Sequence, residues 1–537
     1  MSRDPDVSVI VPVYNGAEYV ERALDSVVRQ TLGLARIRVV MVDDGSTDES
    51  PALLDSIAAA HPSVEVIHQP NSGGPAFPRN LAIGTARGRY VFFLDQDDYL
   101  APDALAAMVG VADENGTDVV LARMKGVGGR SAPRAMYART LPRTDVFASS
   151  AYWTLGPAKL FRTEMIRSVG LRFAEDVRVG EDLPFVSMAY LKGNGISVLA
   201  DKDYIFWVNR DDASNITTSR LTLEDRLVGA SRMFDMLAEA VPPGPKRDAL
   251  MRRHFEVELL DSVFVAYGRE SDAAMRASAF ERFREIGAAY YTAEIESAFQ
   301  PRGRVLMRLV SQGDPERFAA YLEALSEAPH LPEVLVEGER VFLALPWFRD
   351  PFQGLPDDLF DIAPRLKAFC RVEPLTVSSA GVHMSAICRL GELTERVTGV
   401  ELIARPRTGA VDATFPLAFA VPLDETNPVV EVDDTVTAGG LLASPAGEIR
   451  DLYLRVSAGE VWRERRLAEC ALPPSKLRIV QGRGGQGRAI AAVLATTPKG
   501  YLALHALDRT ALARRRLGHV RRSSARAVRG WLGRARS

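Results

Sequence analysis

The sequence predicts an α/β domain with a Rossmann-like mixed sheet, followed by a helical region and a β-rich, sandwich-like module. Near the N-terminus, short apolar runs alternate with segments of helical periodicity, and two of the runs end in acidic clusters. Strands that alternate with helices indicate βαβ units and a parallel sheet. After about residue 218 apolar residues recur at helical spacing, and after about residue 330 short β-type runs are separated by Pro, Gly and Asp.

The N-terminal elements follow one another in a simple order. Each predicted strand is a continuous apolar run, as expected for a strand buried on both faces. Asp43 and Asp44 come directly after the second strand, and Asp95, Asp97 and Asp98 come after the last. The predicted elements are a strand at Ser8–Tyr14, a strand at Ile37–Val42, a helix from about Pro51 to Ala60, and strands at Val64–His68 and Val91–Leu94.

The two acidic clusters point to a metal site. The carboxyl ends of parallel strands meet at one edge of a sheet, so the clusters are expected to face one crevice. Carboxylates repel one another unless a cation joins them, and Mg²⁺ or Mn²⁺ is bound by a few carboxylates together with substrate phosphates. The alternative is that Asp98 caps a helix beginning near Pro102 and that Asp48 caps the helix near Pro51.

Five short segments resemble, in the same order, the motifs of family 2 glycosyltransferases with a GT-A fold. They are Val9–Asn15 (VIVPVYN), Val42–Asp48 (VDDGSTD), Asn71–Asn80 (NSGGPAFPRN), Asp95-Gln96-Asp97 and Gly180–Phe185 (GEDLPF). The resemblance covers about residues 6–218 and implies a GT-A glycosyltransferase domain at residues 1–218. It also implies transfer of a sugar from a nucleotide diphosphate, with a UDP-sugar favoured, to a hydroxyl group.

The resemblance also implies roles for single residues. Asp97 and Asp95 would hold the metal at the diphosphate, and Asp182 would be the general base, with Glu181 beside it as a catalytic or orienting residue. One base without a covalent intermediate inverts the anomeric carbon. The residues expected to bind the nucleotide-sugar are Pro12, Tyr14, Asn15, Asp43, Asp44, Arg79, Asn80, Asp95, Gln96 and Arg210.

Several of these assignments have alternatives. Arg79 either pairs with the diphosphate or forms a structural ion pair, and Asn80 either touches the nucleotide or braces its loop. Arg210 lies in either a closing loop or a solvated one, and Asp182 is either the base or a surface acid. The loop before Arg79 departs from many relatives by having two prolines. A histidine ligand near the end of the catalytic domain, which some relatives use, is not expected here, because no histidine lies between His68 and His254.

The following residues divide into a helical linker region (219–328) and a β-rich module (329–478). Thr222–Asp225 is similar to a capping box, and helices are expected at Arg247–Tyr267, Ala273–Phe299 and Pro315–Ser326. This region is either a spacer packed on the catalytic domain or part of the acceptor site. Short strands are expected at Val334–Val336, Val341–Leu345, Leu375–Ser378, Val400–Ala404 and Leu452–Val456.

This order of domains is similar to that of the polyribitol-phosphate glycosyltransferases that decorate wall teichoic acid. The analogy implies a homo-oligomer formed through the β module. The expected acceptor is a glycan, a polyol-phosphate or a lipid-linked glycan.

Length and composition set the outer limits. A chain of 537 residues is expected to form two to four domains. The three cysteines, Cys370, Cys388 and Cys470, form neither a zinc pattern nor a disulfide framework, which fits a reducing cytosol. The sequence shows no signal-peptide pattern and no apolar stretch of about 18 residues, so a cytoplasmic protein is expected.

Residues 479–537 are expected to form a basic tail. Arg509–Ser537 contains ten arginines and no acid, with apolar residues and Trp531 at helical spacing. A basic amphipathic helix of this kind favours an anionic membrane surface, here the inner face of the cell membrane. The alternatives are a polyanionic acceptor or a solvated tail; nucleic acid is not expected, because no nucleic-acid motif accompanies the arginines.

Two classes of function follow. The first is a metal-dependent, inverting glycosyltransferase that acts on a cell-surface polymer or a lipid-linked glycan. The second is a non-catalytic scaffold or glycan-binding protein derived from the GT-A fold, which works through its β module and basic tail. The joint presence of Asp95, Asp97 and Asp182 favours the enzyme.

Overall fold

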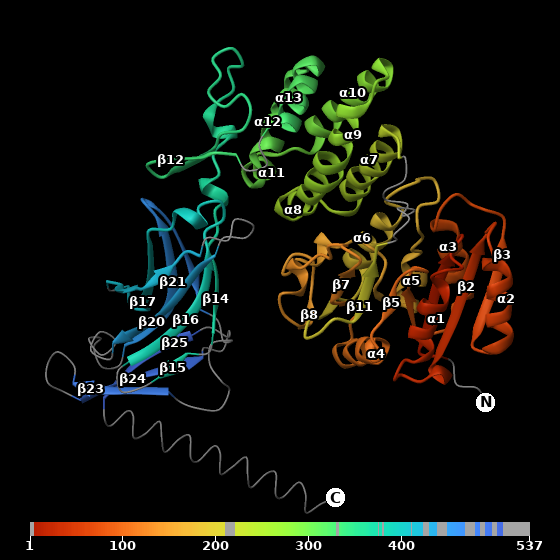
Figure 1. Ribbon diagram of the computed structural model, residues 1–537, viewed down its shortest axis with the longest axis horizontal. Helices are drawn as coiled ribbons and strands as arrows, with labels where there is room; N and C mark the ends of the chain where they lie inside the picture. The colour runs from red at the N-terminus through yellow and green to blue at the C-terminus, as the bar shows by residue number, and fades with distance from the viewer. Residues whose placement is uncertain are drawn as a thin grey trace, which may run out of the picture. The chain divides into compact units, whose positions relative to one another are not determined.

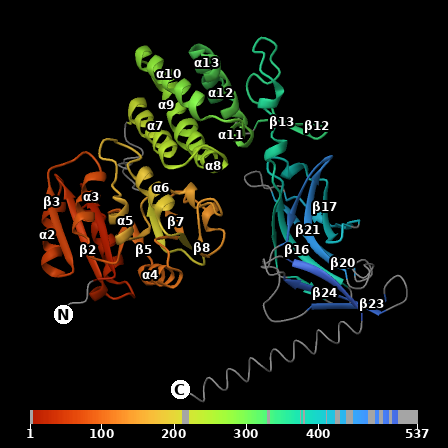
Figure 2. The same ribbon diagram turned by 180° about the vertical axis from the view of Figure 1, so that it is seen from behind.

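The computed structural model divides into two compact units, which are described separately (Figures 1 and 2). The first unit is Met1–Phe299 with Gly303–Glu327, and the second is Gln300–Arg302 with Ala328–Ser537. The structure describes residues 5–209, 221–328, 332–373, 375–377, 381–409, 411–422, 429–437, 448–467, 478–483, 489–496 and 502–508.

The first unit is built on a mixed eight-stranded sheet with the order β3-β2-β1-β4-β9-β6-β10-β8. Strands β3, β2, β1 and β4 run parallel, β9 is antiparallel to both of its neighbours, and β8 is antiparallel to β10. The strands are β1 (Val7–Val13), β2 (Ile37–Asp44), β3 (Val64–Gln69), β4 (Tyr90–Phe93), β6 (Val119–Ala122), β8 (Leu141–Thr144), β9 (Leu160–Arg162) and β10 (Ile196–Leu199). This arrangement confirms the predicted GT-A-like mixed sheet.

Both faces of the sheet are covered, which explains why its strands are continuously apolar. On one face, helices α1, α2 and α4 share a core with Val9, Val11 and Met41 of the sheet. On the other face, Phe93 of β4 packs edge-on against Phe173 and Phe185, with ring centroids 5.0 and 5.6 Å away. The helices are α1 (Val20–Val28), α2 (Ser50–Ala60), α3 (Ala76–Thr85), α4 (Ala104–Asn115), α5 (Thr163–Val169) and α6 (Asp182–Lys192).

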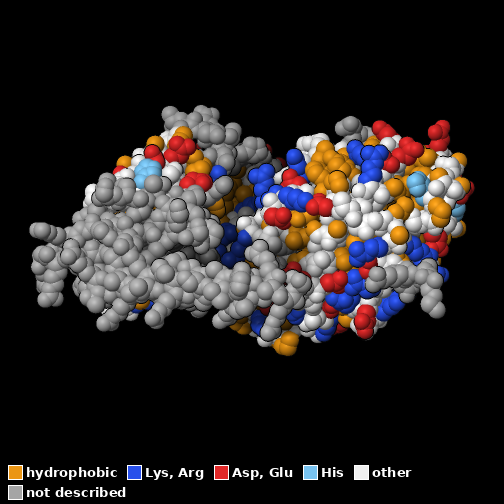
Figure 3. All heavy atoms as spheres, turned by 90° about the horizontal axis from the view of Figure 1, so that it is seen from below, with side chains coloured by type: hydrophobic (Ala, Val, Ile, Leu, Met, Phe, Trp, Pro, Cys, Tyr) orange, Lys and Arg blue, Asp and Glu red, His pale blue; other side chains and the backbone are white. Residues whose placement is uncertain are grey.

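A small second sheet lies beside the strand-end loops. Its order is β5-β11-β7, with β5 at Tyr99–Leu100, β11 at Ile205–Val208 and β7 at Met124–Val127. On the face of the first unit that Figure 3 shows, basic, acidic and hydrophobic side chains are interspersed.

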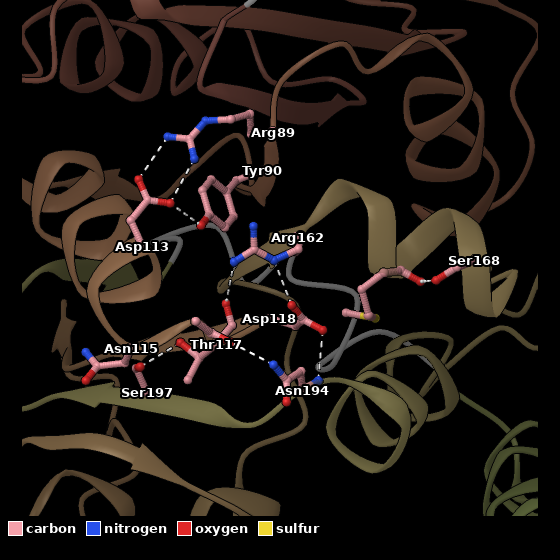
Figure 4. Close-up of polar contacts among 12 residues, drawn as sticks. Arg89, Tyr90, Asp113, Asn115, Thr117, Asp118, Arg162, Ser168, Asn194 and Ser197 are labelled. Atoms are coloured by element: carbon pink, nitrogen blue, oxygen red, sulfur yellow. Dashed lines mark hydrogen bonds and ion pairs between the residues drawn. The ribbon is translucent and has the colours of Figure 1, made fainter.

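A polar network ties the sheet to α4 at the end opposite the acidic strand ends (Figure 4). Arg89 holds both carboxylate oxygens of Asp113, at 2.8 and 2.9 Å, and the Tyr90 hydroxyl donates to the same carboxylate at 2.7 Å. Arg162 donates to Asp118 at 2.7 Å. These contacts lie near the N-terminal ends of β4 and β6 and so stabilise the sheet away from the candidate site.

The helical region that was predicted after residue 218 is confirmed. Thr222 begins α7 with a true capping box, in which its hydroxyl accepts from the Asp225 N–H and the Asp225 carboxylate accepts from the Thr222 N–H. The helices lie side by side (Figures 1 and 2). They are α7 (Leu223–Ala240), α8 (Pro245–His254), a π-helical stretch (Phe255–Val263), α9 (Phe264–Arg269), α10 (Ala273–Tyr290), α11 (Ala293–Ala298), α12 (Pro301–Gln312) and α13 (Pro315–Glu327).

The second unit contains two antiparallel sheets that share one core. Val382 and Met384 of β16 and Leu402 and Leu454 of β17 and β21 belong to the same buried cluster, so the sheets form a sandwich as predicted. One sheet contains β14 (Phe369–Val372), β15 (Thr376–Val377), β16 (Gly381–Arg389), β19 (Phe419–Ala420) and β20 (Val430–Thr437). The other contains β17 (Gly399–Pro406), β18 (Ala413–Leu417), β21 (Ile449–Ala458), β22 (Val461–Arg466), β23 (Arg478–Arg483), β24 (Ala489–Thr496) and β25 (Leu502–Asp508). A hairpin, β12 (Val334–Glu337) with β13 (Arg340–Leu343), precedes them.

Strands β23 to β25 occupy residues for which a basic tail is predicted. The predicted boundary after residue 478 therefore falls inside a sheet. The reason is that residues 489–496 (AIAAVLAT) and 502–508 (LALHALD) are themselves apolar, and the excess of arginine begins only at Arg509. Residues 509–537 lie outside the described residues. Among the described residues, no helix is long and apolar enough to cross a membrane.

Candidate active site

The candidate site lies where β1, β2 and β4 end. These strands are parallel neighbours, with β1 in the middle, so the loops that follow them meet at one edge of the sheet. Asp43 and Asp44 are the last two residues of β2, and the loop after β4 carries Asp95 and Asp97. The two acidic clusters, far apart in the sequence, thus lie at the same edge of the sheet.

Gln96 and Asn15 brace these loops. The Gln96 side chain accepts a hydrogen bond from the Tyr14 N–H at 2.9 Å and donates one to the Tyr14 carbonyl at 3.0 Å. A Cβ atom added at Gly16 would lie 2.2 Å from Gln96 Oε1, so a larger residue there would displace the Gln96 amide. Asn15, with φ 45°, accepts from the Thr47 N–H at 2.8 Å. Gln96 and Asn15 are both predicted to contact the nucleotide-sugar, and in the structure both side chains form hydrogen bonds with the protein backbone.

Pro12 and Tyr14 are the other two residues of this segment that are predicted to contact the nucleotide-sugar. Pro12 lies within β1, and Tyr14 has an exposed side chain at the end of the strand. Tyr14 is therefore accessible to a ligand, and its backbone is fixed by Gln96.

Asp43 and Asp44 are buried and hold neighbouring loops. Asp43 accepts from the Ser46 N–H at 3.0 Å and lies 2.9 Å from His68 Nδ1. The hydrogen bond to Asp43 raises the pKa of His68 above its usual value. Asp44 accepts from the Ser72 N–H at 3.0 Å and from the Ser72 hydroxyl at 2.8 Å. The sequence assigned no role to His68 or Ser72.

Arg79 connects the two acidic motifs of the site. Its guanidinium donates to Asp95 Oδ1 at 2.7 Å and to Glu181 Oε1 at 2.8 Å, and it lies 5.1 Å from the centre of the Phe173 ring. Burial opposes its charge, but the charges of Asp95, Glu181 and Asp182 hold the pKa of Arg79 above its usual value. Arg79 is predicted either to pair with the diphosphate or to form a structural ion pair, and the described contacts are those of the ion pair.

Asn80 braces the segment that leads to the predicted base. Its side-chain amide donates to the Phe173 carbonyl at 2.9 Å and to Glu175 at 2.8 Å, and its carbonyl oxygen accepts from the Phe173 N–H at 2.9 Å. Of the two predicted roles of Asn80, the described contacts are those of the brace. Helix α3 carries both Arg79 and Asn80. It therefore fixes the Arg79 guanidinium with its two ion pairs, here called the Arg79 fork, and the chain near residue 173.

Asp182 is the first residue of α6. Phe185, one turn later, stacks on Phe173 with ring centroids 4.3 Å apart and packs edge-on against Phe93 of β4 at 5.6 Å, which fixes the helix on the sheet. Burial and the neighbouring Glu181 charge raise the pKa of Asp182 to about 7, against the opposing charges of Arg79 and Lys159. Lys159 is buried, which lowers its pKa to about 7, although the charge of Asp182 opposes that shift. A carboxylate that titrates near neutral pH is suited to general base catalysis.

Asp98 does not cap a helix, so that alternative is wrong. Helix α4 begins at Ala104 with Asp103 as its N-cap residue, whereas the buried Asp98 carboxylate accepts from the Val208 N–H at 2.9 Å. Burial and the charges of Asp95 and Asp97 raise its pKa well above the usual range.

Asp48, in contrast, lies at the start of α2. Its carboxylate accepts from the Ser50 N–H at 2.9 Å and from the Ala17 N–H at 3.3 Å. The N-cap residue of α2 is Glu49, so Asp48 lies one position before the predicted cap, and its carboxylate ties the first residue of α2 to the loop after β1.

Asp95 and Asp97 fit part of a magnesium or manganese site. They offer hard oxygen donors at one strand end, which suits these cations. Within the described ranges, no group of three or more His, Cys, Asp or Glu side chains is arranged to hold a metal ion. Two carboxylates completed by substrate phosphates are the usual arrangement for Mg²⁺, so the donor set fits when substrate oxygens complete it. Arg210 lies outside the described residues.

A buried network that the sequence analysis did not predict joins the helical region to α6. Tyr152 lies 2.9 Å from His254 Nε2 and 3.2 Å from the Ser187 hydroxyl, and Ser187 belongs to α6. Glu258 lies 2.7 Å from both His254 Nδ1 and an Arg253 nitrogen. The i,i+4 spacing of His254 and Glu258 in an apolar helical pattern is the signal that could have revealed it.

Comparisons with known proteins define the class of this chain. Residues 8–173 match the glycosyl transferase family 2 domain, and residues 229–322 match the glycosyl transferase TarS linker domain. The succinoglycan biosynthesis protein ExoO of Rhizobium meliloti is 33% identical over 243 residues, which are 43% of this chain and 68% of that protein. The chain belongs to glycosyl transferase family 2.

More particular similarities concern two named enzymes. The chain is 39% identical over 206 residues, 38% of its length, to the poly(ribitol-phosphate) beta-glucosyltransferase of Bacillus spizizenii. It is 35% identical over 218 residues, 41% of its length, to the poly(ribitol-phosphate) beta-N-acetylglucosaminyltransferase TarS of Staphylococcus aureus. These matches span 32% and 38% of the two relatives, so the chain matches about a third of their length.

Solved structures show a similar fold. The crystal structure of S. aureus TarS aligns with 94% of this chain and 85% of that chain, with a TM-score of 0.58 at 21% identity. TarS residues 1–349 in complex with UDP-GlcNAc align with 65% of this chain and 98% of that chain, with a TM-score of 0.56 at 26% identity.

Proposed function

We propose that this chain is a metal-dependent, inverting glycosyltransferase that transfers a sugar from a UDP-sugar to a hydroxyl group of a polyol-phosphate polymer. The observation that carries this proposal is the Arg79 fork, which joins Asp95 at the acidic strand end to Glu181, next to Asp182. The fork fixes a base beside the place where a nucleotide diphosphate is expected to bind, and these two groups are what sugar transfer needs.

The proposed reaction uses Asp182 as the general base. Its carboxylate takes the proton of the acceptor hydroxyl while the hydroxyl oxygen attacks the anomeric carbon, and the bond from that carbon to the diphosphate oxygen breaks. One displacement without a covalent intermediate inverts the configuration. A divalent cation, when bound by Asp97 and Asp95, supplies Lewis-acid stabilisation to the leaving diphosphate.

Other residues of the site position these groups. Glu181 and Arg79 orient Asp182, and the exposed Tyr14 at the end of β1 is available to the nucleotide. Asp43 and Asp44 act on the nucleotide mainly by shaping the loops that contain Ser46 and Ser72, because their carboxylates already accept bonds from those loops.

The substrates are proposed from the relatives. The named poly(ribitol-phosphate) enzymes support a polyol-phosphate acceptor, and the TarS complex with UDP-GlcNAc supports a UDP-sugar donor carrying a hexose or an N-acetylhexosamine. We propose a location at the inner face of the cell membrane. The membrane contact of residues 509–537 and a homo-oligomer formed through the β module stay predictions.

Calorimetric titration with UDP-, GDP- and CDP-sugars, with and without Mn²⁺, tests the donor. We expect tight, metal-dependent binding of a UDP-sugar to the wild type and its loss in Asp97→Ala. Transfer to a ribitol-phosphate oligomer should vanish in Asp182→Asn while donor binding persists. Absence of binding for every donor would instead favour the non-catalytic scaffold.

A further inference from the structure

A pocket separate from the candidate active site lies in the first unit, beside the small sheet. Its volume is about 490 Å³, which is in the range typical of ligand sites, and its wall is formed by β7 and residues 130–137. Four of the lining residues are basic and one is acidic. The residues that matter here are Arg123, Lys125, Arg130, Arg134, Tyr137 and Asp203.

The wall of this pocket is held in a fixed shape. A Cβ atom added at Gly126 would lie 1.7 Å from the Arg130 carbonyl oxygen, so the chain turns back closely over β7. Gly128 and Gly129 make this turn with φ of 68° and 80°, values that favour glycine. Arg130 then lies over the Trp207 ring, 3.3 Å from its centre, and donates to the Val208 carbonyl at 2.9 Å.

The positive charge of the pocket is only partly balanced. Arg123 pairs with Asp203 at 2.8 Å, which neutralises both. Lys125 and Arg134 have exposed side chains, and within the described part of the chain neither forms an ion pair. Two cations at the mouth of a pocket attract an anion, and an arginine fork matches the geometry of a phosphate.

Tyr137 supplies a second observation. Only 6% of this residue is exposed, and its hydroxyl has no hydrogen-bond partner among the residues that the structure describes. This hydroxyl does not belong to the buried side-chain atoms that lack a partner, so it is reachable from the pocket and free to bond to a molecule there. Since Tyr137 lines the pocket, an oxygen-rich ligand in the pocket would provide that partner.

The pocket is connected to the candidate active site through two hydrogen bonds. Arg130 donates to the Val208 carbonyl, and the Val208 N–H donates to the Asp98 carboxylate, each at 2.9 Å. Asp98 directly follows the proposed metal ligand Asp97. The wall of the pocket and the acidic strand end are thus linked through one residue of β11.

We propose that this pocket binds a phosphodiester group of a polyol-phosphate acceptor next to the reacting hydroxyl. Lys125 and Arg134 pair with the phosphate, and the Tyr137 hydroxyl bonds to an oxygen of the polyol. The proposal rests on the proposed function for the identity of the acceptor. The diphosphate of the donor has the same phosphate chemistry, so the test separates the two sources.

The test measures binding of two probes to the full chain by calorimetry. The probes are a synthetic ribitol-phosphate oligomer and UDP with Mn²⁺, and the variants are Lys125→Gln/Arg134→Gln and Tyr137→Phe. The matched control is Arg29→Gln, which removes an exposed cation on α1. We expect about tenfold weaker oligomer binding in the double variant, a loss of roughly threefold in Tyr137→Phe, and unchanged UDP binding.

Each outcome has a defined meaning. Oligomer binding that equals the wild type in both variants overturns the proposal, and so does an equal loss of UDP binding, which would assign the pocket to the donor. A loss of the same size in Arg29→Gln would show a general effect of charge and would also overturn it. A wild type that binds the oligomer in this pocket but transfers no sugar would instead refute the proposed function.

Discussion

Replacing Arg79 by Gln should loosen α6 and raise the pKa of the proposed base. Arg79 is 4% exposed and bonds to Asp95 and Glu181, whose side chains are 38% and 15% exposed. Removing one partner of a buried ion pair costs about 3–5 kcal/mol because the other charge stays buried. Since Asp95 is more than one-third exposed, water replaces part of its lost contact, and we expect about 3 kcal/mol.

Two measurements report this change. Hydrogen exchange of the α6 amides should become faster by roughly a hundredfold, which corresponds to about 3 kcal/mol of local stability. The second measurement is the pH dependence of kcat/KM. The Arg79 charge lowers the pKa of Asp182, which must be ionised to act as a base, so its removal should move the acidic limb from near pH 7 to higher pH.

Matched variants separate the charge of Arg79 from its geometry. Arg79→Lys keeps the charge without the fork, so it should loosen α6 and leave the acidic limb near its wild-type position. Arg89→Gln removes a more exposed arginine, which holds Asp113 at the far end of β4, and should destabilise the sheet slightly without moving the limb. Unchanged α6 exchange together with an unmoved limb in Arg79→Gln would refute the role of this residue.

Three further predictions concern other parts of the first unit. Asp182→Asn should abolish transfer and stabilise the fold, because a pKa raised from 3.8 to about 7 makes ionisation costly. Urea unfolding should show no gain below about pH 4, a gain that grows towards pH 7, and about 4 kcal/mol above it. Gly16→Ala should cost about 1–3 kcal/mol because its Cβ meets the Gln96 amide, and a double-mutant cycle with Gln96→Ala should show costs that do not add, whereas additive costs would contradict the contact. His254→Ala should cost about 3 kcal/mol by leaving Tyr152 and Glu258 without their partner. Because burial lowers the pKa of His254, the wild type should lose stability as pH falls below about 6.5 and the variant should lose less, which thermal unfolding from pH 7.5 to 5.0 will show.

The strands and acidic clusters could be predicted because their signals are local. Each strand is a run of adjacent apolar residues, and Asp43 and Asp95 follow such runs directly. The contacts of the site are not local. Arg79 reaches Glu181 across 102 positions, Asn80 reaches Phe173 across 93, and Gln96 reaches Tyr14 across 82. Whether such a side chain binds a ligand or braces a loop is decided by packing, which residue type and spacing do not reveal.

Composition misled the prediction at the C-terminal end for a different reason. The segment after residue 478 contains Gly, Arg and Gln next to two apolar strands, and averaging over them suggests a basic tail. Strand β24 pairs with β23 and β25 along its whole length, and β25 pairs with β21. These strands complete an existing sheet, which supplies the partners for their backbones, and their own apolar sequence is hidden only when it is averaged with the arginine-rich residues around it.

The contacts of α6 also bear on the role of the helical region, for which spacer and acceptor site were the two predictions. The helix is held on the sheet side by Phe185 and on the other side by Ser187, through Tyr152 and His254. A helix with two separate anchors can rotate or slide only if both break, so its first residue, Asp182, keeps its place. The buried group of His254, Arg253 and Glu258 is what a spacer packed on the catalytic domain requires, since burial of charged groups is costly unless their geometry is exacting. We therefore infer that the helical region supports the helix that carries the proposed base, which is the first of the two predictions.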